Sequence, residues 1–172
     1  MKQQIIVSGI GGQGVLFLTR VIAQVAVNSG IPVLTSETHG MAQRGGTVLS
    51  CIKVGAFASP LIRAGQADLG LLLWDANVSV HRNLLRPDGA MVVNSADKGE
   101  GIRLEAARLA RELGNAVLTN LVLLGAAVRN QVIFCGQQQC EDAIRQLAPA
   151  RFVEQNLAAF HLGLKGAASP AS

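Results

Sequence analysis

The sequence predicts an α/β protein with an open, mostly parallel, Rossmann-like sheet, helices on both faces and a helical C-terminal part. Short, nearly continuous apolar runs alternate with helical stretches through the first half of the chain. Such runs are typical of strands that are buried on both faces of a parallel sheet. A glycine-rich turn follows the first run and opens a helix, and the pattern becomes wholly helical from about Leu104.

The first expected strand covers residues 3–8 and leads into a turn of four glycines in six residues. Residues 15–28 contain no helix breaker and are apolar on nearly all sides, so we expect a helix that is covered by the sheet and also by another subunit. Residues 87–89, Pro-Asp-Gly, are expected to close a short helix. The remaining elements are expected as strands over 32–36, 47–54, 69–73 and 90–94, and as helices over 78–85, 104–113, 119–129, 138–147 and 150–162.

The chain is expected to form a single α/β domain over residues 1–165, with a frayed tail over residues 166–172. Its 172 residues match one ordinary domain, and 49% hydrophobic residues can bury a sizeable core. We find no internal repeat, low-complexity tract or linker that would divide it. The tail is small and polar, and nothing in it can pack against a core.

Composition excludes several classes of protein. No apolar run reaches the roughly 20 residues of a membrane span, and the start has no leader pattern, so we expect a cytoplasmic protein without membrane association. Aromatic residues make up only 3%, which argues against nucleic-acid binding through stacked bases. The net charge of +4 lies within residues 1–67, which hold five basic side chains and one acidic one. Either these basic residues are scattered over the surface, or they form a mildly electropositive face for an anion.

Three cysteines cannot hold a four-thiolate iron–sulfur cluster in one copy of the chain. Cys51, Cys135 and Cys140 are therefore expected to be free thiols, buried or half-buried. No metal site is expected, because no further His or Cys lies at ligand spacing from Glu37 and His39. His81 and His161 are expected to be surface or packing residues.

The glycine turn supplies candidate cofactor-binding residues: Gly9, Gly11, Gly12, Gln13 and Gly14. Glycines let the backbone approach a ligand closely, and the following helix N-terminus offers unpaired N–H groups to an anion. Glu37 lies 23 residues beyond Gly14, near the position of a ribose-binding acid in a dinucleotide fold. The alternative is a tight turn that binds no nucleotide, since the chain leaves no room for a substrate domain.

The segment from Glu37 to Gly46 is the most informative one, because it gathers an acid, an imidazole, a guanidinium and three glycines at the expected carboxyl end of a strand. Ligands bind at that edge of open α/β sheets. Glu37, His39 and Arg44 are candidate catalytic residues, and Arg44, Gly45 and Gly46 are candidate binding residues. Arg44 could hold a carboxylate or phosphate bidentately. It could equally pair with Glu37 and only tie the loop.

These segments carry a family resemblance. The glycine turn, the Glu37–Gly46 segment, residues 120–126 and the segment Asn156-Leu157-Ala158-Ala159-Phe160 together resemble the gamma subunits of 2-oxoacid:ferredoxin oxidoreductases. Within that family the chain is most similar to the beta subunits of indolepyruvate ferredoxin oxidoreductases. The likeness covers roughly residues 4–163, and Trp74-Asp75-Ala76-Asn77 departs from the acidic stretch expected there.

The resemblance implies oxidative decarboxylation of a 2-oxo acid, such as an aryl pyruvate, to an acyl-CoA with ferredoxin as electron acceptor. It implies thiamine diphosphate, iron–sulfur clusters and CoA in an assembled complex, with no cofactor bound by this chain alone. The chain would then be an accessory subunit of a large, alpha-type partner, inactive by itself and coupled to ferredoxin only indirectly. The alternative from the residues alone is a stand-alone dinucleotide-binding oxidoreductase or sensor module.

Overall fold

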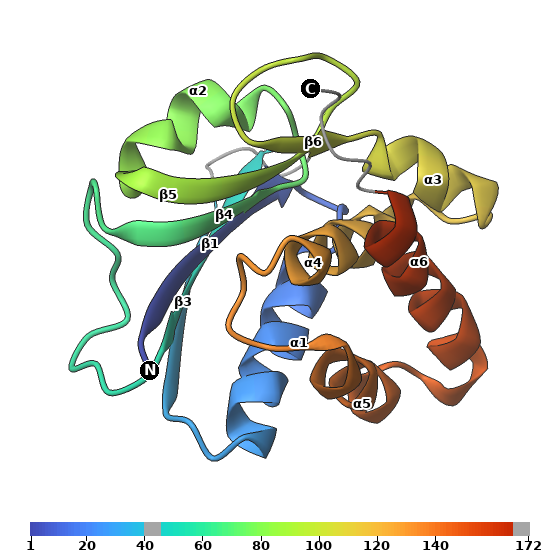
Figure 1. Cartoon of the computed structure of the whole chain (residues 1–172), viewed down its shortest axis with the longest axis horizontal. Coiled ribbons are helices and arrows are strands. Elements are labelled where there is room, and N and C mark those ends of the chain that lie inside the picture. Colours follow the sequence, from blue (N-terminus) through green and yellow to red (C-terminus); the bar gives the residue numbers. More distant parts are fainter. Residues whose placement is uncertain (40–45, 167–172) are drawn as a thin grey trace.

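The computed structural model describes residues 1–39 and 46–166, and these form an open sheet with helices on both faces (Figure 1). Six strands lie in this part of the chain: β1 (Gln3–Ile10), β2 (Val33–His39), β3 (Thr47–Val54), β4 (Ala67–Leu72), β5 (Leu85–Asn94) and β6 (Ile102–Leu104). Their order in the sheet is β2-β3-β1-β4-β5-β6. Neighbours from β1 to β6 pair in parallel, whereas β3 is antiparallel to both β1 and β2. The predicted fold class is therefore confirmed.

The helices follow the predicted pattern closely. They are α1 (Val15–Asn28), α2 (Asn77–His81), α3 (Ala106–Glu112), α4 (Thr119–Arg129), α5 (Gln137–Leu147) and α6 (Val153–Gly166). Single turns of 3-10 helix precede β5, α4 and α6. α1 and α4 begin and end at the predicted residues. Gly166, predicted to begin the tail, ends α6, and the rest of that tail lies outside the described residues.

Two features of the sheet differ from the prediction. β6 was not predicted, and its last residue, Leu104, was expected to begin a helix, because three residues are too short to show a strand pattern. β5 begins at Leu85 and contains the Pro-Asp-Gly segment that was expected to be a turn. Between the pairs Ala67–Leu85 and Leu69–Ala90 the β5 strand has three extra residues, so the turn-forming segment is accommodated as a bulge.

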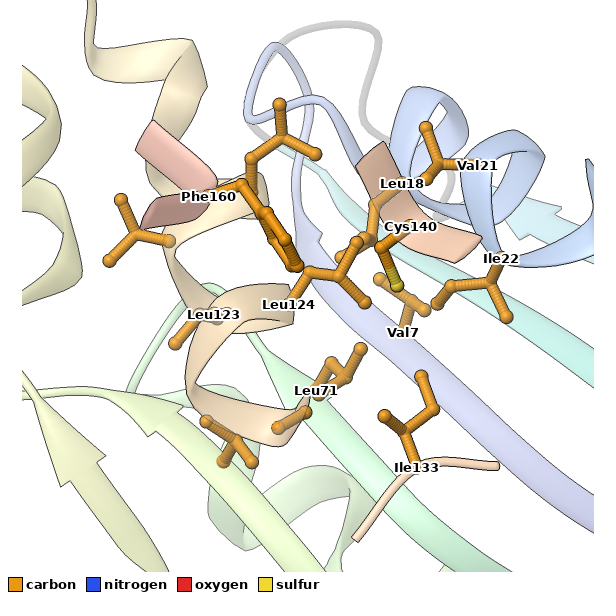
Figure 2. Packing of buried hydrophobic residues seen from close by; sticks show 14 of the residues in the cluster. Val7, Leu18, Val21, Ile22, Leu71, Leu123, Leu124, Ile133, Cys140 and Phe160 are labelled. Atoms are coloured by element: carbon orange, nitrogen blue, oxygen red, sulfur yellow. The ribbon is translucent and has the colours of Figure 1, made fainter. Parts of the chain in front are cut away.

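The main core lies between the sheet and the layer of α1, α4, α5 and α6 (Figure 1). Figure 2 shows its centre, where Leu18 of α1, Leu71 of β4 and Phe160 of α6 converge, all fully buried. α1 packs on the sheet and against α5 and α4 of the same chain. Much of the cover that was expected from another subunit is thus supplied within this chain.

A smaller cluster covers the opposite face of the sheet, beneath α2 and the loop before β4. Its buried members are Ile6, Cys51, Ile62, Ala67, Leu72, Leu85, Met91 and Val93. Consecutive strand residues point to opposite faces, so Ile5 and Val7 join the main core while Ile6 joins this cluster. Both faces of β1 are therefore buried.

The strand order creates a switch point between β1 and β4. From β1 the chain continues through α1 to β2 on one side, whereas β4 lies on the other side of β1 and continues to β5. In open α/β sheets, ligands bind in the crevice outside the carboxyl ends of two such strands. The glycine turn follows β1 directly, so it borders this crevice.

Candidate functional site

Gly9 and Gln13 stabilise the conformation of the glycine turn. Ile10 N–H donates to Gln13 Oε1 over 2.9 Å, and Gln13 Nε2 donates to the carbonyl of Leu73, just after β4, over 3.2 Å. A Cβ on Gly9 would lie 2.8 Å from Gln13 Oε1 and 2.9 Å from Cγ2 of Val15. Both residues therefore shape the turn and fasten it to the end of β4, which is a structural role.

Gly14 connects the turn to α4. Its φ of +78° lies in the left-handed region that favours glycine, and it is the N-cap of α1. The Gly14 carbonyl accepts a hydrogen bond of 3.0 Å from Nδ2 of Asn120, at the start of α4. Asn120 was quoted from sequence only for the family resemblance, because a contact 106 residues away leaves no local signal.

Gly11 and Gly12 form the outward part of the turn and are exposed. Gly12 has a φ of +89°, and a Cβ built on it would meet no atom within 4 Å. Gly14, the N-cap of α1, has no side chain that could accept from the first N–H groups of this 14-residue helix. These N–H groups lie at the same edge of the sheet as the turn. Among the five turn candidates, Gly11 and Gly12 are thus the two exposed ones.

The last residue of the second candidate segment, Glu37–Gly46, contacts the glycine turn. The Gly46 carbonyl accepts a hydrogen bond of 3.1 Å from the N–H of Gly11. Glu37 is exposed on β2 and pairs in register with Ser50. His39 ends β2, but its side chain, and both Arg44 and Gly45, lie outside the described residues. The structure therefore unites Gly46 with the turn and leaves the predicted roles of the other members as predictions.

The position of β3 bears on the dinucleotide alternative. In a dinucleotide fold the strand with the ribose-binding acid lies beside the strand before the glycine turn. Here β3 lies between β2 and β1, so the Glu37 strand is two strand spacings from β1, about 10 Å. β2 and β1 run in the same direction, and both pair antiparallel with β3 between them. The geometry argues against a ribose-binding role for Glu37.

A cavity of about 440 Å³ lies beyond the ends of β4 and β5, and sequence reasoning assigned it no function. It is lined by Trp74, Asp75, Ala76 and Asn94. Asp75 Oδ2 accepts a hydrogen bond of 2.8 Å from Ser95 Oγ. Asn94 Nδ2 donates to the Leu73 carbonyl over 3.1 Å. The only sequence signal was the departure of Trp74-Asp75-Ala76-Asn77 from the family pattern.

A buried polar network supports β1 just before the turn, on the face of α2. The Nδ1 atom of His81 lies 2.8 Å from Ser8 Oγ, and Nδ2 of Asn77 donates to Ser8 Oγ and to the Gly9 carbonyl. Burial lowers the pKa of His81 below its usual range. His81 is thus a packing residue, as one of its two predicted roles allowed.

The cysteines are free and buried, as predicted. Cys135 Sγ and Cys140 Sγ lie 3.4 Å apart. The hydrogen bond with Cys135, together with burial, raises the pKa of the Cys140 thiol. Cys51 belongs to the cluster on the other face of the sheet. In the described part of the chain no three His, Cys, Asp or Glu side chains are grouped so that they could hold a metal ion.

Two of the five basic side chains of residues 1–67, Lys2 and Lys53, lie away from the glycine turn. Nζ atoms of Lys2 and Lys53 lie 4.9 and 5.0 Å from the centre of the Phe57 ring. Gln3 pairs with Val54, so these lysines lie at the edge of the sheet opposite the glycine turn. These two lysines therefore do not contact an anion bound at the turn. No helix within the described ranges is long and apolar enough to cross a bilayer.

Comparisons with known proteins agree on one family. The chain is 30% identical to the indolepyruvate oxidoreductase subunit IorB of Archaeoglobus fulgidus, over 98% of this chain and 97% of that protein. The crystal structure of a keto/oxoacid ferredoxin oxidoreductase gamma subunit from Geobacter sulfurreducens matches with a TM-score of 0.78 at 26% identity. That match covers 96% of this chain and 98% of the other.

A third match shows the same fold within a larger chain. The 2-oxoglutarate:ferredoxin oxidoreductase from Magnetococcus marinus, solved with 2-oxoglutarate, coenzyme A and succinyl-CoA bound, matches with a TM-score of 0.79 at 17% identity. The match covers 95% of this chain and 30% of that one. The family model described as pyruvate ferredoxin/flavodoxin oxidoreductase matches residues 4–166. The chain therefore belongs to the pyruvate ferredoxin/flavodoxin oxidoreductase family.

Proposed function

We propose that this chain is the accessory subunit of a 2-oxo acid:ferredoxin oxidoreductase and completes a binding site for an anionic substrate on a large partner subunit. The observation that carries this proposal is the hydrogen bond from Gly11 N–H to the Gly46 carbonyl. It continues the β1–β3 ladder beyond the Ile10–Thr47 pair and joins the two candidate segments at the carboxyl end of β1. Membership of the family indicates the reaction class. This edge of the sheet is the part of the chain that we assign to binding the substrate.

The 2-oxo acid of this proposal is an aryl pyruvate. Its support is the nearly full-length similarity to an indolepyruvate oxidoreductase subunit, together with the segments that resemble that branch. The decarboxylation yields an acyl-CoA, and its electrons pass to ferredoxin.

The proposal assigns the thiamine diphosphate and the iron–sulfur clusters to the partner subunit. The residues of this chain do not fit a four-thiolate cluster, because it has three cysteines and Cys51 lies on a different face of the sheet from Cys135 and Cys140. What the chain contributes is the positioning of a substrate.

Coenzyme A is the substrate that we place at the glycine turn. Its phosphates suit exposed backbone N–H groups and the N-terminus of α1, where the aligned peptide dipoles favour negative charge. The open space around Gly12 lets a bulky phosphate approach the backbone. In this proposal Arg44 adds a bidentate pair of hydrogen bonds to the same ligand. Binding here orients the thiol of coenzyme A toward the partner's active site and excludes water from it.

Reconstitution tests this function. The chain and its large subunit are purified separately and together, and reduction of a viologen dye by indolepyruvate and coenzyme A is measured. We expect activity only from the complex. Dye reduction by the isolated chain would contradict the proposal and favour a self-contained oxidoreductase. Binding of NAD(P)H or flavin by the isolated chain, followed by absorbance, would point to the dinucleotide-binding alternative.

A further inference from the structure

We propose that the cavity beyond β4 and β5 is a subsite for the adenine ring of coenzyme A, with Trp74 as the stacking surface. This inference rests on the proposed function, which places the phosphates of the same ligand at the glycine turn. The cavity volume of about 440 Å³ lies within the range of small-ligand sites. It is therefore large enough for a purine ring beside an aromatic side chain.

Trp74 is unusual in its exposure. It is the chain's single Trp, and 44% of its surface remains accessible although it is the residue after a fully buried Leu73. A large aromatic side chain at the wall of a cavity offers a flat apolar face, and stacking a base on such a face contributes substantially to binding. Trp74 lines this open cavity together with Asp75, Ala76 and Asn94, so its exposed face can stack on a planar ligand.

One carbonyl connects the cavity with the glycine turn. The Leu73 carbonyl accepts hydrogen bonds from Nε2 of Gln13, in the turn, and from Nδ2 of Asn94, in the cavity wall. The two places are therefore neighbours that are held in a fixed relation. A single ligand can place its phosphates on the turn and its base in the cavity. On the other side of β1, β3 separates the turn from the Glu37 strand.

The polar groups of the cavity select the chemistry of its occupant. Both ends of the Asn94 amide are already bonded, since its Oδ1 accepts from the N–H of Ala107. Asp75 is held by Ser95 Oγ and lies 3.7 Å from Arg103, while 45% of its side-chain surface stays exposed. A carboxylate favours a ring that carries N–H donors, such as the exocyclic amine of adenine, and repels the carboxylate of a 2-oxo acid. The geometry thus separates the base from the reacting acid.

Trp74 also supplies the probe, because its fluorescence reports only on this site. The full-length chain is titrated with coenzyme A, with adenosine 3′,5′-bisphosphate, and with 4′-phosphopantetheine, which lacks adenosine. Free N-acetyltryptophanamide corrects for absorbed light. We expect saturable quenching by the two adenine compounds and none by 4′-phosphopantetheine. Equal quenching by 4′-phosphopantetheine, quenching by phenylpyruvate alone, or no quenching at all would overturn the inference.

Substitutions separate this inference from the function on which it rests. In the assembled enzyme, Trp74→Ala should raise the KM for coenzyme A about tenfold, whereas Trp74→Phe should retain most of the affinity. Leu61→Ala, which also removes an exposed apolar side chain but outside the cavity, should change nothing. If Gly12→Asp weakens the binding of coenzyme A and Trp74→Ala does not, the adenine subsite is wrong and the proposed function stands. If Trp74→Ala instead abolishes assembly with the large subunit, Trp74 is a protein contact and the inference fails.

Discussion

Asn120 and Gly14 are joined by a hydrogen bond of 3.0 Å from the Asn120 side chain to the Gly14 carbonyl. The contact fixes the start of α4 against the start of α1, two elements that are far apart in the sequence. Asn120 is almost completely buried, and its Oδ1 also accepts from the N–H of Leu121. The glycine turn is therefore held from the helical layer as well as from the sheet.

Asn120→Ala should lower the free energy of unfolding by about 1 kcal/mol, because it removes the hydrogen bond between α4 and the turn, whereas the Gly14 carbonyl keeps its bond from Leu18 N–H. Urea denaturation measures this loss. Asn28→Ala serves as the matched control, since Asn28 also hydrogen-bonds through its side chain but does so at the surface. Equal stability losses in the two variants would mean that the contact between α4 and the turn contributes nothing special.

Gly163→Ala and Gly125→Ala should each destabilise the crossing of α4 and α6. A Cβ on Gly163 would collide with the Val122 carbonyl, and a Cβ on Gly125 with the Phe160 carbonyl. Because both obstacles are backbone atoms, relief requires the helices to separate, and we expect a loss of about 3 kcal/mol.

The control for this pair is Gly136→Ala, before α5. A Cβ there meets nothing closer than 3.9 Å, and its φ of −98° suits any residue. Thermal unfolding should show a small shift for Gly136→Ala and a large one for the crossing variants. Similar shifts in all three would refute the close-packing argument.

His81 should make stability depend on pH. Burial lowers its pKa in the folded chain, so the unfolded chain binds a proton more readily. Stability is then complete above the ordinary histidine pKa of about 6.5 and is lost as the pH falls below it. The free energy of unfolding is measured from pH 8 to about pH 5 for the wild type and for His81→Gln. We expect the wild type to lose more stability over this range, and parallel curves would contradict the prediction.

The reach of sequence reasoning is clearest in the helices. α1 and α4 were predicted to the residue because each is a long apolar run without a breaker. β6 and the bulge in β5 were missed, since pairing with a neighbouring strand outweighs the turn preference of residues 87–89. The insertion of β3 between β1 and β2 depends on which strands pair, and the sequence of one strand does not determine its neighbours in the sheet.

The candidate site was predictable only in its local parts. The glycine turn is a contiguous motif, and the sequence placed it correctly after a strand and before a helix. Trp74 and Asn94 follow different strands, and the cavity that they line together exists only in the folded chain. The same holds for His81, whose partner Ser8 is 73 residues away.

Arg44→Lys in the assembled complex tests the ligand role predicted for this residue. An ammonium cannot reproduce a bidentate pair of hydrogen bonds, so kcat/KM for the 2-oxo acid or coenzyme A should fall about tenfold or more. Assembly and thermal stability should remain near the wild type. If stability or assembly falls first and the kinetics of assembled enzyme are unchanged, Arg44 only ties the loop to Glu37.

The affinity of the assembled enzyme for coenzyme A, compared between Gly12→Asp and Gly30→Asp, tests the central claim most directly. Both glycines are exposed, have positive φ values of +89° and +68°, and have open space where a Cβ would lie. The backbone strain of an aspartate is therefore similar at the two positions, and aspartate is among the side chains that tolerate such values best. Only Gly12 belongs to the glycine turn, where a carboxylate would repel a phosphate. The account predicts at least tenfold weaker binding for Gly12→Asp and wild-type binding for Gly30→Asp, measured by calorimetry. Wild-type binding in both variants would contradict it.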